Sequence, residues 1–280
     1  MPVNLLLCEG GANSPDVRVL RKLLSGYCGE IRPAGSRYGM GDRIQAYREA
    51  LGQRQVAGIL DGDFRKDWTP DRPLQDPLLW QTKDQSIHFG WRWSRKEIEN
   101  YVIDPLVVSH SLAPVAPPQE EYAARLSEAA DRITVYQAAR TALSNCRRRF
   151  RDLPANWGRE QGPGKHPFPH DLSDHGCREG IRATVRSHHS EQAVTPEQVL
   201  SRYEELLPQF AAGGVRRSDF LWTFAGKDLL HVMEAGLVRL GFRNAKAFRE
   251  KVLLGIESTN EDIATWSPEW SALRNAVEAF

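Results

Sequence analysis

Two aspartates separated by a single glycine follow a buried-strand pattern near residue 60. The apolar run VAGIL (56–60) leads directly into Asp61-Gly62-Asp63. In an extended chain, residues 61 and 63 project to the same side, and the glycine lets the backbone approach a ligand closely. Paired carboxylates repel each other unless a cation neutralises them, and their hard oxygens suit Mg²⁺ or Mn²⁺. The spacing therefore predicts a divalent-metal site. The alternative is a solvated Asp-Gly turn.

A glutamate stands at the corresponding place after the first apolar run. Glu9 ends the segment VNLLLCE (3–9) and is followed by Gly10-Gly11. Open α/β sheets bind their ligands beyond the carboxyl ends of their strands. We therefore expect Glu9 to lie at the same sheet edge as Asp61. The alternative is an ordinary loop residue after a strand.

Three segments of the first 105 residues together resemble a known family. They are LLLCEGG with the following DVRVLRKLL, then VAGILDGD, then WRWSRKEIENYV. These segments resemble the TOPRIM domain of the OLD family of nucleases, in particular the stand-alone TOPRIM subunits that accompany an ABC-type ATPase in bacterial phage-defence systems. The resemblance implies that Glu9, Asp61 and Asp63 bind catalytic Mg²⁺ or Mn²⁺ ions.

One position departs from the family pattern. The family usually has a second acid four residues after the glutamate, where this chain has Asn13, and the nearest acid is Asp16. A short insertion would place Asp16 in that role, which is the interpretation favoured here because Pro15-Asp16 then starts the helix where the family starts it. The alternative is a weakened second metal site.

The segment SRKEIENYV carries two further acids. Ser94 and Glu97 have the spacing of a capping box, in which each side chain satisfies a backbone amide at a helix start. Glu99 has no such explanation, and the resemblance implies that a glutamate in this segment helps to hold a metal. We therefore predict that Glu99 belongs to the metal site and Glu97 does not. The alternative for Glu99 is a salt bridge to a nearby arginine.

A Gly-Lys pair lies far along the chain, in FAGKDLL (224–230). It resembles a Gly-Lys that recurs after the helical region of related subunits, which implies that Lys227 is a catalytic lysine. An ammonium group beside a metal site can stabilise the charge that builds on a phosphate during its transfer. The alternative is a surface lysine at a helix start. The sequence contains no G-x-x-x-x-G-K-[ST] motif, so the chain is not a P-loop ATPase.

Arginines gather in two places that could contact phosphates. Arg147, Arg148 and Arg149 lie in the cluster CRRRFR, and Arg178 and Arg182 are four residues apart on one face of an expected helix. Rows of arginine match a phosphate backbone. We predict that both groups bind nucleic acid. The alternative is a solvated helical face held by salt bridges.

The remaining patterns predict the elements that position these residues. Apolar runs at 3–9, 30–35, 56–63 and 86–93 alternate with helical segments, among them 42–51, which indicates an α/β fold. The expected fold is a TOPRIM (Rossmann-like) parallel sheet flanked by helices, with a mostly helical insertion and C-terminal region. The expected parts are a catalytic core (1–112), a helical insertion (113–212) with one long amphipathic helix, and a C-terminal helical segment (213–280) packing back on the core. Segment 153–176 is expected to be irregular, and helices are expected to start at Thr195-Pro196 and Ser267-Pro268.

The composition places only broad limits on the class of protein and on its partners. The chain of 280 residues is 41% hydrophobic and 26% charged with a formal net charge of +1, so any nucleic-acid surface must be local. The four cysteines form no C-x-x-C pair, and no stretch approaches the roughly 20 apolar residues that span a bilayer. We therefore expect a cytoplasmic protein with reduced thiols and no membrane partner.

The expected function is divalent-metal-dependent cleavage of phosphodiester bonds in DNA or RNA. The resemblance implies an effector subunit of a bacterial anti-phage defence system, partnered by an ABC-type ATPase, and a homo-oligomer is a further possibility. The alternative is a non-catalytic or silenced regulatory subunit of an ATPase complex. A haloacid-dehalogenase-type phosphatase would need an aspartate where this chain has Glu9.

Overall fold

A computed structural model describes residues 3–50, 55–64, 75–147, 157–158, 166–167, 171 and 173–280. Its centre is a five-stranded sheet with strand order β2-β1-β3-β5-β4. The strands are β1 (Val3–Cys8), β2 (Cys28–Pro33), β3 (Val56–Leu60), β4 (Leu78–Gln81) and β5 (His88–Arg92). All neighbouring pairs are parallel except β4 with β5. The expected α/β class and the four expected strands are confirmed, whereas the antiparallel edge strand β4 was not foreseen.

The two faces of the sheet are covered differently. Alternate residues of β1 point to opposite faces, so Leu6 joins the large core with helix α1 (Pro15–Leu23), while Leu5 and Leu7 join a smaller cluster. Helix α2 (Met40–Ala50) closes that smaller cluster. The expected helix at 42–51 is thus present. Coverage on both faces buries the central strands β1 and β3 along almost their whole length, which explains their continuous apolar runs.

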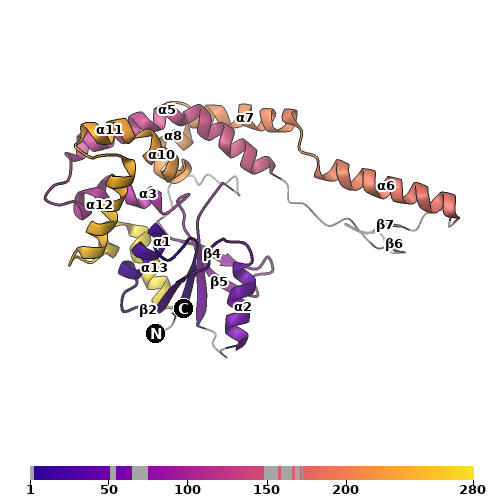
Figure 1. The fold of residues 1–280 in the computed structure, drawn as a ribbon, viewed down its shortest axis with the longest axis horizontal. Coiled ribbons are helices and arrows are strands. Elements are labelled where there is room, and N and C mark those ends of the chain that lie inside the picture. The colour runs from indigo at the N-terminus through magenta and orange to yellow at the C-terminus, as the bar shows by residue number, and fades with distance from the viewer. Residues whose placement is uncertain are drawn as a thin grey trace.

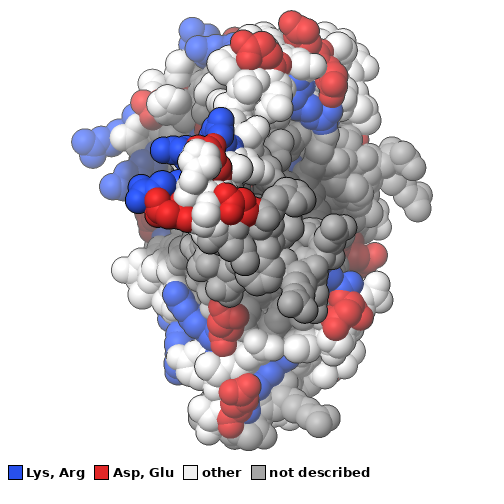
Figure 2. Space-filling model, turned by 90° about the vertical axis from the view of Figure 1, so that its right-hand side faces the viewer, with Lys and Arg blue, Asp and Glu red and all other residues white. Residues whose placement is uncertain are grey.

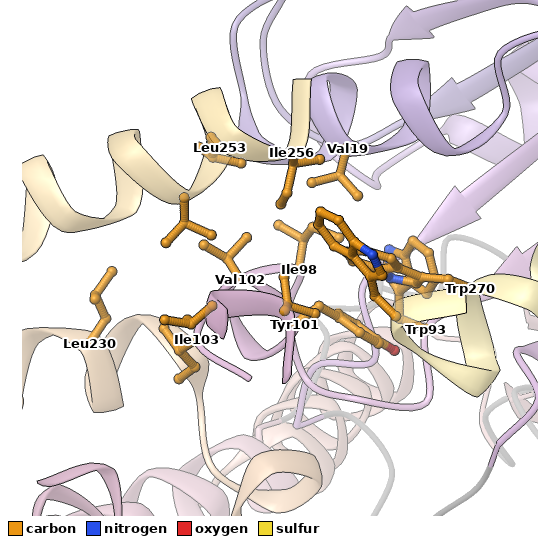
Figure 3. Packing of buried hydrophobic residues seen from close by; sticks show 14 of the residues in the cluster. Val19, Trp93, Ile98, Tyr101, Val102, Ile103, Leu230, Leu253, Ile256 and Trp270 are labelled. Carbon is orange, nitrogen blue, oxygen red and sulfur yellow. The ribbon is translucent and has the colours of Figure 1, made fainter. Parts of the chain in front are cut away.

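The segment that follows β5 runs through the middle of the large core. Figure 3 shows Ile98, Tyr101 and Val102 surrounded by side chains from α1, α12 (Ala245–Ser258) and α13 (Pro268–Glu278). Tyr101 is fully buried and its ring lies 5.0 Å from that of Trp93, centroid to centroid. Such burial fixes the backbone between residues 97 and 103, and with it the acidic side chains that this backbone carries.

The rest of the chain is mostly helical, as expected. The remaining helices are α3 (Glu99–Val102), α4 (Pro105–Ser111), α5 (Gln119–Cys146), α6 (Asp174–Gln192), α7 (Pro196–Phe210), α8 (Val215–Ser218), α9 (Phe220–Thr223), α10 (Gly226–Val232), α11 (Glu234–Arg239) and a 3₁₀ turn, η1 (Ile263–Trp266). The long amphipathic helix is α5, which packs along α7, and α6 extends away from the body (Figure 1). Two short strands, β6 (Trp157–Gly158) and β7 (His166–Pro167), pair in parallel.

The C-terminal helices return to the sheet. Helix α10 packs on α3, and α12 packs on α1 and α4. One continuous hydrophobic core joins these helices to β1, β3 and β5. The boundaries at 112 and 212 stay predictions. The expected irregular segment 153–176 lies largely outside the described residues, although α6 already begins at Asp174.

Two predicted helix starts differ in how they are capped. Thr195 and Gln198 form the expected capping box at the start of α7. The last helix also starts at Pro268, but the Ser267 side chain makes no capping bond. None of the helices in the described part of the chain is both long and apolar enough to pass through a lipid bilayer.

Candidate active site at the carboxyl edge of the sheet

The carboxyl ends of β1 and β3 bring two predicted site residues together. Because these strands are parallel neighbours, Glu9 and Asp61 emerge at the same edge. The backbone N–H of Asp61 donates a hydrogen bond of 3.2 Å to Oε1 of Glu9. Strand β5 is parallel to β3, as expected, so the segment that follows it reaches the same edge.

Asp16 joins these residues from the start of α1. Helix α1 starts at Pro15, as expected from the sequence, and Ser14 caps it by accepting from the Val17 N–H. Burial raises the pKa of Asp16 to about 7, and the nearby carboxylates of Glu99 and Glu9 add to this, whereas Lys227 opposes it. The favoured insertion is therefore compatible with the position of Asp16 among the other acids.

Asp61 lies in the most unfavourable environment for a carboxylate. Burial raises its pKa well above the usual range, and the charges of Asp16 and Glu9 raise it further. Its Oδ1 atom is buried and has no hydrogen-bond partner. Positive charge beside Asp61 would therefore favour its ionised form.

The predicted capping box at Ser94 is wrong. The Ser94 N–H and hydroxyl donate to the carboxylate of Glu269, at 2.7 and 2.6 Å, and α3 begins only at Glu99 without a side-chain cap. Glu97 instead accepts a 3.0 Å hydrogen bond from the backbone N–H of Lys227. The reason for excluding Glu97 from the site therefore fails.

Lys227 lies between the two glutamates. Its Nζ atom is 3.5 Å from a carboxylate oxygen of Glu99 and 4.0 Å from one of Glu97. Glu99 is only 1% exposed, and Arg249 approaches it to 3.6 Å. Burial raises the pKa of Glu97. Burial of Lys227 by itself would lower its pKa, but the nearby charges of Glu99 and Glu97 raise it overall. We refer to Glu9, Asp16, Asp61, Glu97 and Glu99 as the acidic cluster.

Asn100 connects the two chain segments that carry Glu97 and Lys227. Its Oδ1 atom accepts from the N–H groups of Glu97 and Gly226, at 3.0 and 3.1 Å, and its Nδ2 donates to the Phe224 carbonyl. A β-carbon on Gly226 would lie 2.5 Å from the backbone nitrogen of Asn100. The glycine of the Gly-Lys pair is thus required for this close approach. Asn100 was missed from the sequence because two of its three partners, Gly226 and Phe224, lie more than a hundred residues away.

Asp63 occupies a different place. It adopts φ 47°, and its carboxylate pairs with Arg37. Its backbone N–H donates to the Lys96 carbonyl, and the Lys96 ammonium donates to the Asp63 carbonyl, both at 3.0 Å. A β-carbon on Gly62 would lie 2.2 Å from the Arg95 carbonyl oxygen, so only glycine fits between the two aspartates. Asp63 is not among the main charges acting on Asp16 or Asp61.

The acids do not yet form a coordination sphere. Within the described ranges, no three carboxylate, imidazole or thiol side chains are arranged so that they could hold a metal ion as they stand. The cluster instead has cations within it and at its margin: Lys227, Arg249 and Arg140, the last 3.8 Å from Glu97. Arg140 also pairs with Asp228, the residue that follows Lys227.

The predicted nucleic-acid-binding arginines are mostly paired or undescribed. Arg147 is exposed and donates to the Tyr38 hydroxyl at 3.0 Å, while Arg148 and Arg149 lie outside the described residues. On α6, Arg178 pairs with Asp174 and Arg182 with Glu179. Figure 2 shows acidic and basic side chains interspersed on one face of the molecule, with no large basic patch among the residues described there.

No protein-family model matches the chain, and no curated protein or solved structure shows significant similarity to it.

Proposed function

We propose that this protein hydrolyses phosphodiester bonds in nucleic acid with the help of Mg²⁺ or Mn²⁺ bound at the acidic cluster. The observation that carries the proposal is the convergence of acids from separate chain segments on one lysine at the carboxyl edge of a parallel sheet. Open α/β folds bind ligands at this edge, and acids with strongly raised pKa values collect at functional sites.

The residues fit a hard divalent cation in their chemistry. Oδ1 of Asp61 is buried and lacks a hydrogen-bond partner, whereas Oε2 of Glu99 is buried with the Lys227 ammonium 3.5 Å away as its ion-pair partner. Buried oxygens without partners are costly, and crowded carboxylates are stable as anions only beside positive charge. A bound cation would relieve both costs. Since the side chains do not form a ligand set as they stand, binding requires carboxylates to turn toward the ion.

Glu9, Asp16, Asp61 and Glu99 are the residues proposed to hold the metal. When bound, a divalent cation makes water more acidic and draws charge from a phosphate oxygen. The ammonium of Lys227, whose side chain is 56% exposed, can reach a phosphate from the solvent side and stabilise the negative charge that develops there. Glu97 and Asn100 position this lysine through its backbone and that of Gly226.

The TOPRIM fold, the defence role and the ABC-type ATPase partner belong to the same proposal and are supported by the sequence resemblance. The substrate class is DNA or RNA. One observation favours the second candidate, a subunit that is silent by itself: Lys227 and Arg249 neutralise Glu99, and Arg37 neutralises Asp63. Cations of the protein would then compete with the metal until a partner displaces them.

The test separates metal binding from cleavage. Binding of Mn²⁺ to the purified chain is measured by calorimetry, and cleavage is measured on supercoiled plasmid, single-stranded DNA and RNA with Mg²⁺, Mn²⁺ or EDTA. Metal binding with metal-dependent cleavage supports the nuclease. Metal binding without cleavage supports the silent subunit. Failure to bind Mn²⁺ at millimolar concentration would overturn the metal site itself.

A further inference from the structure

A pocket of about 570 Å³ opens directly beside Asp63. Its walls come from the loop after β3, the strand β4 with its following turn, the end of β5, and α9. The residues used in the argument are Asp63, Trp80, Lys83, Arg92, Lys96 and Trp222, all of which line it. We call it the Lys96 pocket. Its volume is typical of a site for a small molecule or one unit of a polymer.

Lys96 is the unusual member of this pocket. The residue is only 7% exposed, and its ammonium makes one hydrogen bond, to the Asp63 carbonyl. The Phe64 ring lies 5.0 Å from Nζ. Among the described residues, no carboxylate forms an ion pair with Lys96. An ammonium has three donors, so its remaining hydrogen-bonding capacity and its charge are not matched by a carboxylate among the described residues.

An uncompensated buried ammonium indicates an anionic ligand. Removing a charge from water is costly unless an opposite charge accompanies it. Lys83 also lines the pocket, as does Arg92, which makes interactions of its own. Asp63 is the one acid among the described lining residues, and its carboxylate already pairs with Arg37. The lining therefore favours a group with negative charge. A phosphate fits this requirement because several cationic donors can share its oxygens.

The other walls favour a flat ring. Trp222 and Trp80 line the pocket, and the Arg95 guanidinium lies 4.1 Å from the Trp222 ring centroid, which holds that indole in place. Tryptophan faces bind nucleobases by stacking, whatever the base. Polar side chains of β4 and its turn, including Gln81 and Gln85, add hydrogen-bonding groups. Phosphate-binding and base-stacking groups thus occur in one cavity.

We propose that the Lys96 pocket binds one nucleotide of the substrate strand, with its phosphate at Lys96 and its base against Trp222. This inference deepens the proposed function and rests on it, since the nucleotide is taken to belong to the strand that is cut at the acidic cluster. Gly62 and Asp63 line the pocket and directly follow Asp61 in the chain. A strand bound in the pocket would therefore lie next to Asp61 of the acidic cluster.

Binding is measured in EDTA, so that no cleavage occurs and failure of the nuclease proposal does not affect the result. The probes are a fluorescein-labelled single-stranded oligonucleotide, adenosine monophosphate, adenosine and inorganic phosphate. We expect the monophosphate to bind at least tenfold more tightly than adenosine or phosphate alone. Lys96→Gln should weaken the oligonucleotide and the monophosphate about tenfold, since it removes a charge-assisted hydrogen bond. Trp222→Phe should reduce any quenching of tryptophan fluorescence by the monophosphate.

Lys246→Gln is the matched control, because Lys246 is exposed and lies on α12. It should leave every affinity unchanged. Lys96→Gln removes an unpaired buried charge and keeps a donor for the Asp63 carbonyl, so the variant should melt at no lower temperature than the parent protein. If its melting temperature is lower, Lys96→Met is used instead. If neither the oligonucleotide nor the monophosphate binds, or if Lys96→Gln leaves the binding of both unchanged, the site is overturned. Monophosphate binding that needs Lys96, with oligonucleotide binding that does not, would overturn the assignment to the substrate strand.

Discussion

The acidic cluster and the Lys96 pocket lie at the same edge of the sheet and hold buried charge of opposite sign. In the cluster, carboxylates outnumber the cations that approach them, and the pKa values of Asp16 and Asp61 rise as a result. In the pocket, burial lowers the pKa of Lys96 to about 7, and the neighbouring charge of Arg216 adds to this. Charge that the fold leaves uncompensated indicates a ligand more directly than charge that the fold pairs.

Paired charges elsewhere in the molecule provide the contrast. Arg18 bridges from α1 to Glu250 and Glu257, and Arg274 pairs with Asp262. The Arg18 pairs tie α12 to α1, and the Arg274 pair joins two parts of the C-terminal segment. Each carboxylate in them already faces an arginine near the surface, so they need no ligand to explain them. We expect the acidic cluster to differ from such pairs in requiring a bound cation.

The largest expected effect is on cleavage. Asp61→Asn removes a buried carboxylate that we assign to the metal, and metal-dependent cleavage should fall by more than the roughly 10- to 100-fold that losing an outer-shell partner of a metal costs. The sequence predicts the same loss for Asp63→Asn, whereas a smaller loss is expected from its pairing with Arg37 outside the acidic cluster. Cleavage rates in Mg²⁺ and Mn²⁺ are compared with those of Asp76→Asn, an exposed control. Full activity of the Asp61 variant, with an unchanged melting temperature, would exclude the cluster as the site.

A smaller difference is expected between the two glutamates beside Lys227. Glu99→Gln should lower Mn²⁺ affinity and cleavage by at least the roughly 10- to 100-fold that losing an outer-shell partner costs, because Glu99 is proposed to bind the metal itself. Glu97→Gln keeps an oxygen that can accept from the Lys227 N–H and should cost less than tenfold. Calorimetric Mn²⁺ titration and cleavage rates decide between them. The opposite order would assign the metal to Glu97 and reverse the sequence-based choice.

The third expected effect is on stability as a function of pH. The folded pKa of Asp16, about 7, exceeds the ordinary value of 3.8, so the folded protein holds more protons than the unfolded chain between these values. Unfolding free energy of the metal-free protein should therefore fall as pH rises from 4 to 7, by at most about 1.4 kcal/mol per pH unit for one proton. Asp61, whose pKa is also raised, acts in the same direction.

Urea denaturation in EDTA across this range measures the slope, and Asp16→Asn should reduce it. Added Mn²⁺ should stabilise the protein more at pH 8 than at pH 6, because metal binding competes with protons for the same carboxylates. If the metal-free wild type and the variant both become more stable toward pH 7, the pKa values of these acids are not raised in the folded protein.

Local patterns predicted the parts of this site that local structure creates. Apolar runs ending in Glu9 and Asp61 predicted parallel strands, and parallel strands place both acids at one edge. The capping box at Ser94 failed because Glu269, 175 residues away, supplies a charged acceptor that Ser94 bonds instead. The edge strand β4 was missed because it has only four residues and exposes Leu79. Interactions of this kind depend on how distant segments pack, which periodicity does not reveal.

The smallest expected effect concerns the arginines, and it compares two regions again. Replacing Arg147, Arg148 and Arg149 with glutamate should weaken binding to duplex DNA and reduce the slope of log affinity against log salt by about 0.9 for each phosphate that the protein no longer neutralises. Replacing Arg178 and Arg182 should change the slope less, because Asp174 and Glu179 already pair with them on α6. Fluorescence anisotropy at several salt concentrations gives both slopes. Equal slopes for the two variants would mean that the local ion pairs do not restrain the α6 arginines. If both variants keep the slope of the parent protein, both groups of arginines face solvent or a protein partner.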